Sequence, residues 1–215
     1  MNLEGNRVDL KSFTNDVIPF LFKWHQDPVF DAMMSQEVGP KSEYDIQTRY
    51  GSMVKSGRVF VVTEHGENAP VGIVCLINID TINRKAEIYG GLGEKRNKGL
   101  GAEALKMMVS WGVEQLGLQR IYANIISTNK ESVNLLQNAG FKKEAEFKNE
   151  IYQGGRFHNR IVMGFNLASD LPANIVEHIT GFLASRKDSG KKVHGGYVEM
   201  LNEFCEYVRK TGGDE

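Results

Sequence analysis

The sequence predicts an α/β (α+β) fold in which a mixed β-sheet is flanked by helices. Three patterns support this prediction. β-rich runs separated by polar turns form an antiparallel N-terminal meander, a long amphipathic run then leads to a further strand, and two alternating runs meet at a glycine turn. Because a helix joins the last meander strand to the next strand, those two strands are expected to be parallel.

The composition is that of an ordinary globular protein. Its 215 residues suffice for one core with a small appendage, and the hydrophobic (41%) and charged (25%) fractions fall in the usual range. The formal net charge of −1 provides no general attraction to nucleic acid or to an anionic membrane, so neither is an expected partner. Any anion site must therefore be local.

Cysteine usage and hydropathy bear on the location of the protein. Cys75 and Cys205 lie far apart and are too few for a disulfide framework or a metal cluster. The histidines do not fall at ligand spacing, so no metal is expected. No run of about 18 apolar residues occurs, and the first five residues lack the regions of a signal peptide. We expect a cytoplasmic protein.

The first quarter of the chain is predicted to contain one strand and two helices. Residues 7–10 have the pattern of a short strand. Thr14 is expected to cap a helix that runs to about His25, and Pro28 keeps the chain from continuing it. Ser42-x-x-Asp45 resembles a capping box and starts a second helix.

The middle of the chain supplies the meander and its crossover. Strands are expected at residues 59–63, 71–77 and 86–92, separated by polar turns. An amphipathic helix with Gly117 at its C′ position then leads to a strand at residues 120–126.

A short helix and a hairpin complete the predicted core. Asn129 is suited to cap a helix over residues 130–139, and residues 144–152 and 157–165 form the hairpin. The expected domain spans residues 1–166.

Residues 167–215 are predicted to form a C-terminal two-helix extension. Amphipathic patterns at residues 171–182 and 198–210 indicate the helices, and a basic glycine break at residues 189–192 separates them. Short amphipathic helices need a surface that covers their apolar sides. The extension is therefore expected to dock on the core or on the second subunit of a homodimer.

A glycine-spaced basic loop carries the clearest functional signal. Arg96-x-x-Gly99-x-Gly101-Ala102 lies between a strand and a helix, where glycines let the backbone approach an anion and the helix start presents unpaired N–H groups. A Walker loop is excluded because no Lys-Ser/Thr follows Gly101. A dinucleotide fingerprint is excluded because the loop follows an antiparallel meander.

Together with Asn129-x-x-Ser132 and Gly140-Phe141, this loop resembles the GNAT superfamily of acetyl-CoA-dependent N-acetyltransferases over residues 7–166. The most similar subgroup comprises ribosomal-protein N-terminal, polyamine and nucleotide-amino-sugar acetyltransferases. The resemblance implies a GNAT-like mixed sheet, acetyl-CoA as cosubstrate and a splayed parallel strand pair that holds the pantetheine arm. It also implies a set of coenzyme A contacts: Arg96, Asn97, Lys98, Gly99, Leu100, Gly101 and Ala102 at the pyrophosphate, Leu92, Glu94 and Asn129 at the pantetheine arm, and Ser132 near the phosphates.

Acetylation of an amine needs a base for the ammonium proton and a proton for the leaving thiolate. Glu87 is the candidate base and acceptor contact, with an ordinary strand carboxylate paired to Arg84 or Lys85 as the alternative. Many members of the superfamily carry a tyrosine acid in the helix before the Gly-Phe, and the matching position here looks like Leu136, which cannot donate a proton. Three hydroxyls are candidate replacements, Tyr122, Ser132 and Tyr152, and water is a further one because a thiol needs little help near neutral pH.

The N-terminal helical region lines the acceptor side in this superfamily. Trp24, His25 and Met33 are therefore candidate substrate contacts, with core packing as the alternative. The expected reaction is direct attack by a primary amine, because no activated cysteine is evident. A nucleotide-linked amino sugar is the first expected acceptor, and a protein N-terminus or a polyamine is the alternative. A non-catalytic module that binds acyl-CoA or recruits a partner is the rival of another class.

Overall fold

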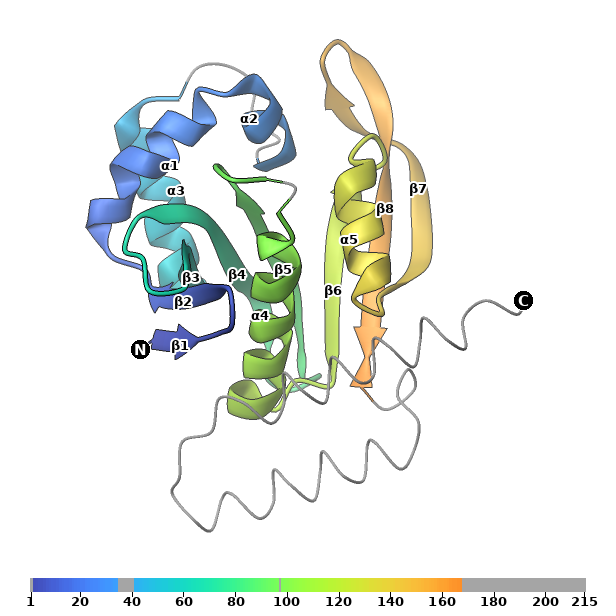
Figure 1. Ribbon diagram of the computed structural model, residues 1–215. Helices are drawn as coiled ribbons and strands as arrows, with labels where there is room; N and C mark the ends of the chain where they lie inside the picture. The colour runs from blue at the N-terminus through green and yellow to red at the C-terminus, as the bar shows by residue number, and fades with distance from the viewer. Residues whose placement is uncertain (1, 35–40, 97, 168–215) are drawn as a thin grey trace.

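The computed structural model describes residues 2–34, 41–96 and 98–167. Their strands are Asn2–Glu4 (β1), Val8–Ser12 (β2), Arg58–Glu64 (β3), Pro70–Asp80 (β4), Lys85–Leu92 (β5), Arg120–Ile126 (β6), Lys142–Gln153 (β7) and Arg156–Asn166 (β8). These strands form one eight-stranded sheet in the order β1-β2-β3-β4-β5-β6-β8-β7 (Figure 1).

Helices cover both faces of this sheet (Figure 1). The helices are Ile18–His25 (α1), Pro28–Met34 (α2), Glu43–Ser56 (α3), Leu100–Leu116 (α4) and Lys130–Asn138 (α5). Alternation along β3 divides the core: Val59 and Val61 pack with α1–α3, whereas Phe60 and Val62 pack with α4. The result is two apolar layers with the sheet between them, as expected for a helix-flanked sheet.

One pair of neighbouring strands, β5 and β6, differs from the rest in its relative direction. All other neighbouring strands pair antiparallel, whereas β5 and β6 pair parallel. That pairing is brief and ends at Glu87 opposite Tyr122, after which the two strands separate. The predicted mixed sheet, with its meander and its splayed parallel pair, is confirmed.

Three predicted helix ends are confirmed. Ser42 accepts a hydrogen bond from the Asp45 amide and the Asp45 side chain accepts one from the Ser42 amide, which completes the capping box of α3. Gly117 ends α4 with a φ of 64°, in the left-handed region that glycine adopts easily. Asn129 caps α5 by accepting a hydrogen bond from the Ser132 amide.

The helix expected to begin at Thr14 begins later. Residues Asn15–Val17 form a 3₁₀ turn, and Thr14 makes no cap because its hydroxyl bonds the Asp16 side chain instead. Pro28 does more than end α1: it is the first residue of α2, a position where its missing N–H costs nothing. The three-residue edge strand β1 was not predicted because it is too short to show a period.

The β7–β8 hairpin is confirmed, and it folds back so that β8 lies against β6. Near its turn, the Gln153 side chain donates to the Ala32 carbonyl at 2.8 Å, which joins the hairpin to α2 across the molecule. The described part of the chain ends at Leu167, which is 1% exposed. The predicted extension at residues 168–215 lies outside the described residues. Among those residues, no helix is both long enough and apolar enough to cross a membrane.

Candidate active site

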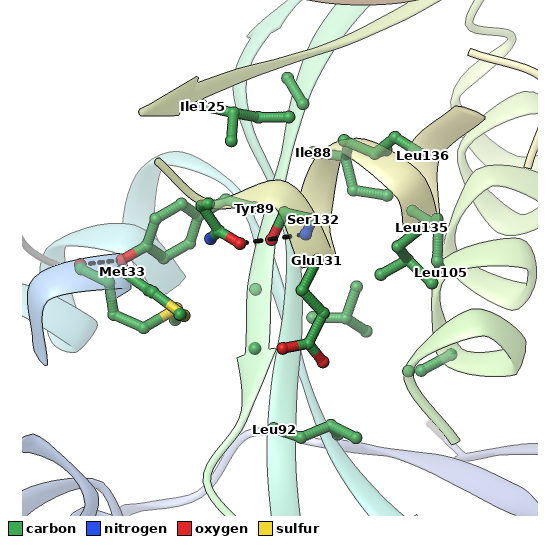
Figure 2. Close-up of a pocket in the computed structure, with 18 of the residues that line it drawn as sticks. Met33, Ile88, Tyr89, Leu92, Leu105, Ile125, Glu131, Ser132, Leu135 and Leu136 are labelled. Carbon is green, nitrogen blue, oxygen red and sulfur yellow. Dashed lines mark hydrogen bonds between the residues drawn. The ribbon is translucent and has the colours of Figure 1, made fainter. Parts of the chain in front are cut away.

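A cavity of about 280 Å³ crosses the sheet where β5 and β6 separate. Leu105, Leu135 and Leu136 from α4 and α5 form its wall on one side, and Met33 and Tyr89 form the opposite wall (Figure 2). Beyond their last pair, Glu87 and Tyr122, the facing edges of β5 and β6 have no ladder between them. An extended ligand with amide groups fits such a gap because it can hydrogen-bond the open strand edges.

The glycine loop lies at one end of the cavity, and Gly99, Gly101 and Ala102 line it. Gly99 has a φ of 76°, which an L side chain adopts only with strain. The loop leads directly into α4, whose first amides have no partner within the helix. This arrangement can bind a phosphate, as the sequence predicted for a helix start.

Arg7 is a loop contact that sequence reasoning missed. Its guanidinium donates to the Lys98 carbonyl, and a Cβ added at Gly99 would lie 2.9 Å from its Nη1. The backbone amides of Asn6 and Arg7 donate to Glu103 at 2.6 and 3.0 Å, which ties the β1–β2 turn to α4. No local pattern points to Arg7, because the loop lies about ninety residues further along the chain.

Arg96 lines the cavity with its side chain already engaged. Its Nε donates to the Leu92 carbonyl at 2.9 Å, its Nη2 lies 3.2 Å from Asp27, and its guanidinium lies 5.7 Å from the Phe30 ring centroid. Arg96 therefore joins the loop to the start of α2 and still adds positive charge to the cavity wall.

The other predicted coenzyme A contacts differ in their positions relative to the cavity. Leu92 lines the cavity, whereas Glu94 does not: its carboxylate bonds Lys23 at 3.0 Å and Trp24 Nε1 at 3.4 Å. The Glu94 amide donates to the Val71 carbonyl at 3.1 Å. Leu100 is buried and Lys98 is exposed, while Asn97 lies outside the described residues.

The start of α5 forms another part of the wall. Asn129 and Ser132 both line the cavity, and the Ser132 amide donates to Asn129 Oδ1 at 3.0 Å. Leu136 also faces the cavity from α5 (Figure 2). The position at which relatives were expected to carry a tyrosine is therefore on the cavity wall, and here it is apolar.

Two of the predicted substrate contacts are packed in the core. A Cβ at Gly93 would lie 2.0 Å from Trp24 Cδ2, so the turn after β5 is folded directly onto the indole. His25 is buried between Asp31, whose Oδ1 is 2.6 Å from Nδ1, and the Tyr50 hydroxyl, 3.0 Å from Nε2. Neither Trp24 nor His25 lines the cavity, whereas Met33 does, together with Phe30 and Met34 of the same helix.

Asp31 and Lys41 form an ion pair beside the buried His25 side chain. Burial lowers the pKa of His25, although the hydrogen bond to Asp31 opposes this shift. Burial alone would raise the pKa of Asp31, but its hydrogen bonds from His25 and Lys41 outweigh that effect and lower it. Lys41 bonds both Asp31 oxygens at 2.9 Å. This cluster holds α2 against α3, behind the cavity wall.

Tyr89 is a second cavity residue that was missed. Its hydroxyl donates to the Met34 carbonyl and accepts from Arg49 Nη2 at 3.0 Å, and burial raises its pKa to about 12. It therefore stays protonated at neutral pH. The signal was the two-residue period of β5, which places Tyr89 on the same face as Glu87.

Glu87 and Tyr122 lie side by side where the strands part. The Glu87 carboxylate accepts hydrogen bonds from Asn78 at 2.8 Å and Asn124 at 2.9 Å. Burial raises the pKa of Tyr122, and the negative charge of Glu87 adds to this shift. Neither Glu87 nor Tyr122 lines the cavity directly, but Asn124 does. The third candidate hydroxyl, Tyr152, is exposed and packs on Phe157 in the hairpin.

Comparison with known proteins places this geometry in a family. A profile of the acetyltransferase (GNAT) domain matches residues 7–142. The chain belongs to the GNAT acetyltransferase family. The resemblance inferred from the loop and the Asn129 motif is thereby confirmed.

Individual GNAT relatives agree with this assignment. The chain is 32% identical over 110 residues to a spermidine N(1)-acetyltransferase of Escherichia coli K12, a match that covers 51% of this chain and 58% of that protein. The chain thus spans little more than half of this curated relative. A Vibrio cholerae spermidine N-acetyltransferase in complex with CoA and spermine superposes with a TM-score of 0.67 at 23% identity, covering 75% of this chain and 96% of that one. Ribosomal-protein-S5-alanine acetyltransferase of Vibrio fischeri gives 0.67 at 20% identity, covering 80% and 100%. The two structures show the shared GNAT fold.

The chain's own residues fit the acetyl-CoA that GNAT proteins use. The loop offers a positive φ, open amides and nearby cationic side chains for phosphate, and the splayed strands offer unpaired edges for an amide-containing arm. In the part of the chain that the structure describes, no group of His, Cys, Asp or Glu side chains is arranged to hold a metal ion.

Proposed function

We propose that this protein transfers the acetyl group of acetyl-CoA to a primary amine. The observation that supports this most is the cavity through the sheet, because it joins the glycine loop on the α4 side to the face that carries Tyr89 and Asn124. A thioester threaded between β5 and β6 would present its carbonyl carbon to that second face. The acceptor then needs no access to the phosphate side.

The proposed mechanism is direct attack of the neutral amine on the thioester carbonyl. Glu87 takes the ammonium proton, through a water because its carboxylate is set back from the cavity wall. The thiolate leaves and is protonated by water or by Ser132, the predicted hydroxyl that reaches the cavity. An acyl-cysteine route through Cys75 is disfavoured since burial raises the pKa of this thiol, which keeps it protonated.

For the acceptor we propose an aliphatic amine of the polyamine class. Phe30, Met33 and Met34 offer an apolar wall suited to methylene groups. Within the described residues no ion pair neutralises Glu87, so its charge is available to an ammonium group. The name of the spermidine-acetylating relative agrees with this class. The nucleotide-linked amino sugar and the protein N-terminus stay as alternative predictions.

A panel of acceptors tests the proposal. Purified protein is incubated with acetyl-CoA and, separately, with spermidine, a nucleotide-linked amino sugar, and a peptide with a free N-terminus, and the release of free thiol is measured. We expect the highest kcat/KM for spermidine. A preference for the sugar or the peptide would overturn the acceptor class and leave acetyl transfer intact.

Leu136 favours a second candidate, a module that binds acyl-CoA without catalysis. This residue occupies the cavity position where a proton donor was expected, and the hydroxyl of α5 that lines the cavity, Ser132, lies one helical turn earlier. Tight CoA binding by calorimetry together with no thiol release on any amine would support the module. Restoring a donor by Leu136→Tyr would then be expected to create turnover.

A further inference from the structure

The polar network around Glu87 is built from amides. Asn78 Nδ2 bonds one carboxylate oxygen at 2.8 Å and Asn124 Nδ2 bonds the other at 2.9 Å. The two asparagines come from β4 and β6, on either side of β5. Both oxygens of Glu87 are therefore held from opposite sides by donors that carry no charge.

The position of Asn78 is specified by the backbone. The β4–β5 register shifts between Ile77 and Asp80, and Asn78 in this bulge has a φ of 51°. Asparagine tolerates the left-handed region better than most residues. The bulge turns the Asn78 amide toward the neighbouring strand, where Glu87 lies.

Asn124 is oriented by a second contact. Its Oδ1 accepts from Arg160 Nη1 at 2.5 Å, and Arg160 is itself held by Glu150 at 2.6 and 2.9 Å. A guanidinium can only donate, so the amide oxygen of Asn124 must face Arg160 and its NH₂ must face Glu87. Asn124 also lines the cavity, which makes it the contact between the cavity and the carboxylate behind it.

We propose that Asn124 and Asn78 are positioning residues that fix the Glu87 carboxylate beside the cavity, where it receives the proton of the acceptor amine. This inference rests on the proposed acetyl transfer. A donor on each oxygen, one from either neighbouring strand, holds the carboxylate in one orientation. Because these donors are neutral amides, neither cancels the negative charge of Glu87, whereas a lysine or arginine partner would.

Other charged and titratable groups face this network from the surrounding strands. They are Asp80 on β4, Arg120 and Tyr122 on β6, Glu150 on β7 and Arg160 on β8. Arg160 is paired with Glu150, and Arg120 is paired with Glu144. The amide contacts are thus the direct hydrogen bonds to Glu87 in the described residues.

Asn124→Ala and Asn124→Asp test the proposal through kcat, with the KM for acetyl-CoA measured beside it. In Asn124→Ala, Glu87 loses a donor that fixes its carboxylate, so kcat should fall about ten- to hundredfold while the KM for acetyl-CoA stays unchanged. Asn124→Asp has the same shape but donates no hydrogen bond to Glu87 and places a like charge beside it, so its kcat should fall further still. A packing role predicts the reverse order, since the isosteric aspartate would then be nearly as active as the wild type.

Two further variants separate this inference from the proposed function. Asn159→Ala removes a matched amide–carboxylate hydrogen bond, 2.5 Å to Glu146, away from the cavity, and it should leave kcat unchanged. Glu87→Gln should lower kcat, and adding Asn124→Ala to it should cost little more, because Asn124 acts through Glu87.

The outcomes are distinct. If Glu87→Gln lowers kcat and the Asn124 variants keep the wild-type kcat, the positioning role is overturned and the base stands. An unaltered kcat in Glu87→Gln overturns the base and the positioning role together. Absence of thiol release by the wild-type protein on every amine overturns the proposed function itself, and this inference with it.

Discussion

At the residue scale, two glycines in left-handed conformations at the ends of α4 differ in what surrounds them. Gly99 has a φ of 76° and faces Arg7 and the cavity, whereas Gly117 has a φ of 64° and nothing within 4 Å of an added Cβ. The backbone strain of an alanine is therefore similar at both sites, about 1–2 kcal/mol. Only Gly99 belongs to the loop that is expected to contact phosphate.

We expect Gly99→Ala to weaken CoA binding by about tenfold or more, because the loop must leave its conformation and carry its N–H groups off the phosphate. Gly117→Ala should lose similar stability and bind CoA normally. Calorimetric titration with CoA and denaturant melts of both variants measure the two effects. Equal CoA affinity in the two variants would contradict the phosphate-loop assignment.

His25 gives the protein a pH-dependent stability. Its pKa lies below the usual 6.5 chiefly because of burial, so the unfolded chain takes up a proton before the folded one does. Stability is full above about pH 6.5 and is lost as the pH falls toward the lowered pKa. His65 acts in the opposite sense: its hydrogen bond to Asp9 raises its pKa, so its contribution is present at low pH and is lost as the pH rises.

We expect the free energy of unfolding of the wild type to fall between pH 7 and pH 5, and His25→Gln to flatten that slope while lowering stability at pH 7. Urea denaturation across this range measures both. His65→Gln is the matched control and should steepen the fall. A His25→Gln slope equal to that of the wild type would show that the imidazole is not buried in its neutral form.

At the element scale, the N-caps of two helices allow an effect on stability to be distinguished from an effect on ligand binding. Ser42 caps α3 away from the cavity, and Asn129 caps α5 while lining it. Both caps accept a hydrogen bond from a first-turn amide that otherwise has no partner in the helix. Their loss should therefore have the same local cost and different functional consequences.

Ser42→Ala and Asn129→Ala should each lower the free energy of unfolding by about 1 kcal/mol. The KM for acetyl-CoA should rise only in Asn129→Ala, and Asn129→Asp should restore stability because aspartate also caps. Denaturant melts and steady-state kinetics test this. A raised KM in Ser42→Ala would mean that cap loss alone disturbs the site.

At the scale of the whole molecule, the described core is closed by its last residue. Leu167 is 1% exposed, packs in the α4 layer, and its amide donates to the Gln119 carbonyl at 2.9 Å. The predicted two-helix extension, which lies outside the described residues, would begin directly after this residue. Its amphipathic pattern predicts docking on the core or on another subunit, and a shortened chain distinguishes the two.

A chain ending at Asp170 should fold, bind acetyl-CoA and elute from a sizing column as a smaller species than a full-length homodimer. Circular dichroism, calorimetry and light scattering check the three expectations. Retention of the full-length oligomeric state by the shortened chain would place the subunit contact in the core instead. Failure to fold would show that the extension is part of the core.

Much of the fold was predictable because its signals are local. The capping box at Ser42, the glycine at 117 and the Asn129 cap are each specified by neighbours within a few residues, and all three hold. Thr14 failed as a cap for an equally local reason, since Asp16 competes for its hydroxyl. The glycine loop and the Asn129 motif were enough to predict the family.

Tertiary structure alone decided which side chains meet at the cavity. Trp24 and His25 are residue types that often line binding pockets, yet both are buried in the core. Trp24 packs under Gly93, and His25 packs against Tyr50. Tyr89 reaches the site on one face of β5, and Arg7 reaches it from the distant β1–β2 turn. Asn124 reaches it because β5 and β6 separate there. The sequence by itself determined most of the elements and the glycine loop before α4, because these depend on backbone angles and neighbouring residues. The far wall of the cavity depends on how β5 and β6 separate, and contacts between distant segments leave no period or motif in the chain.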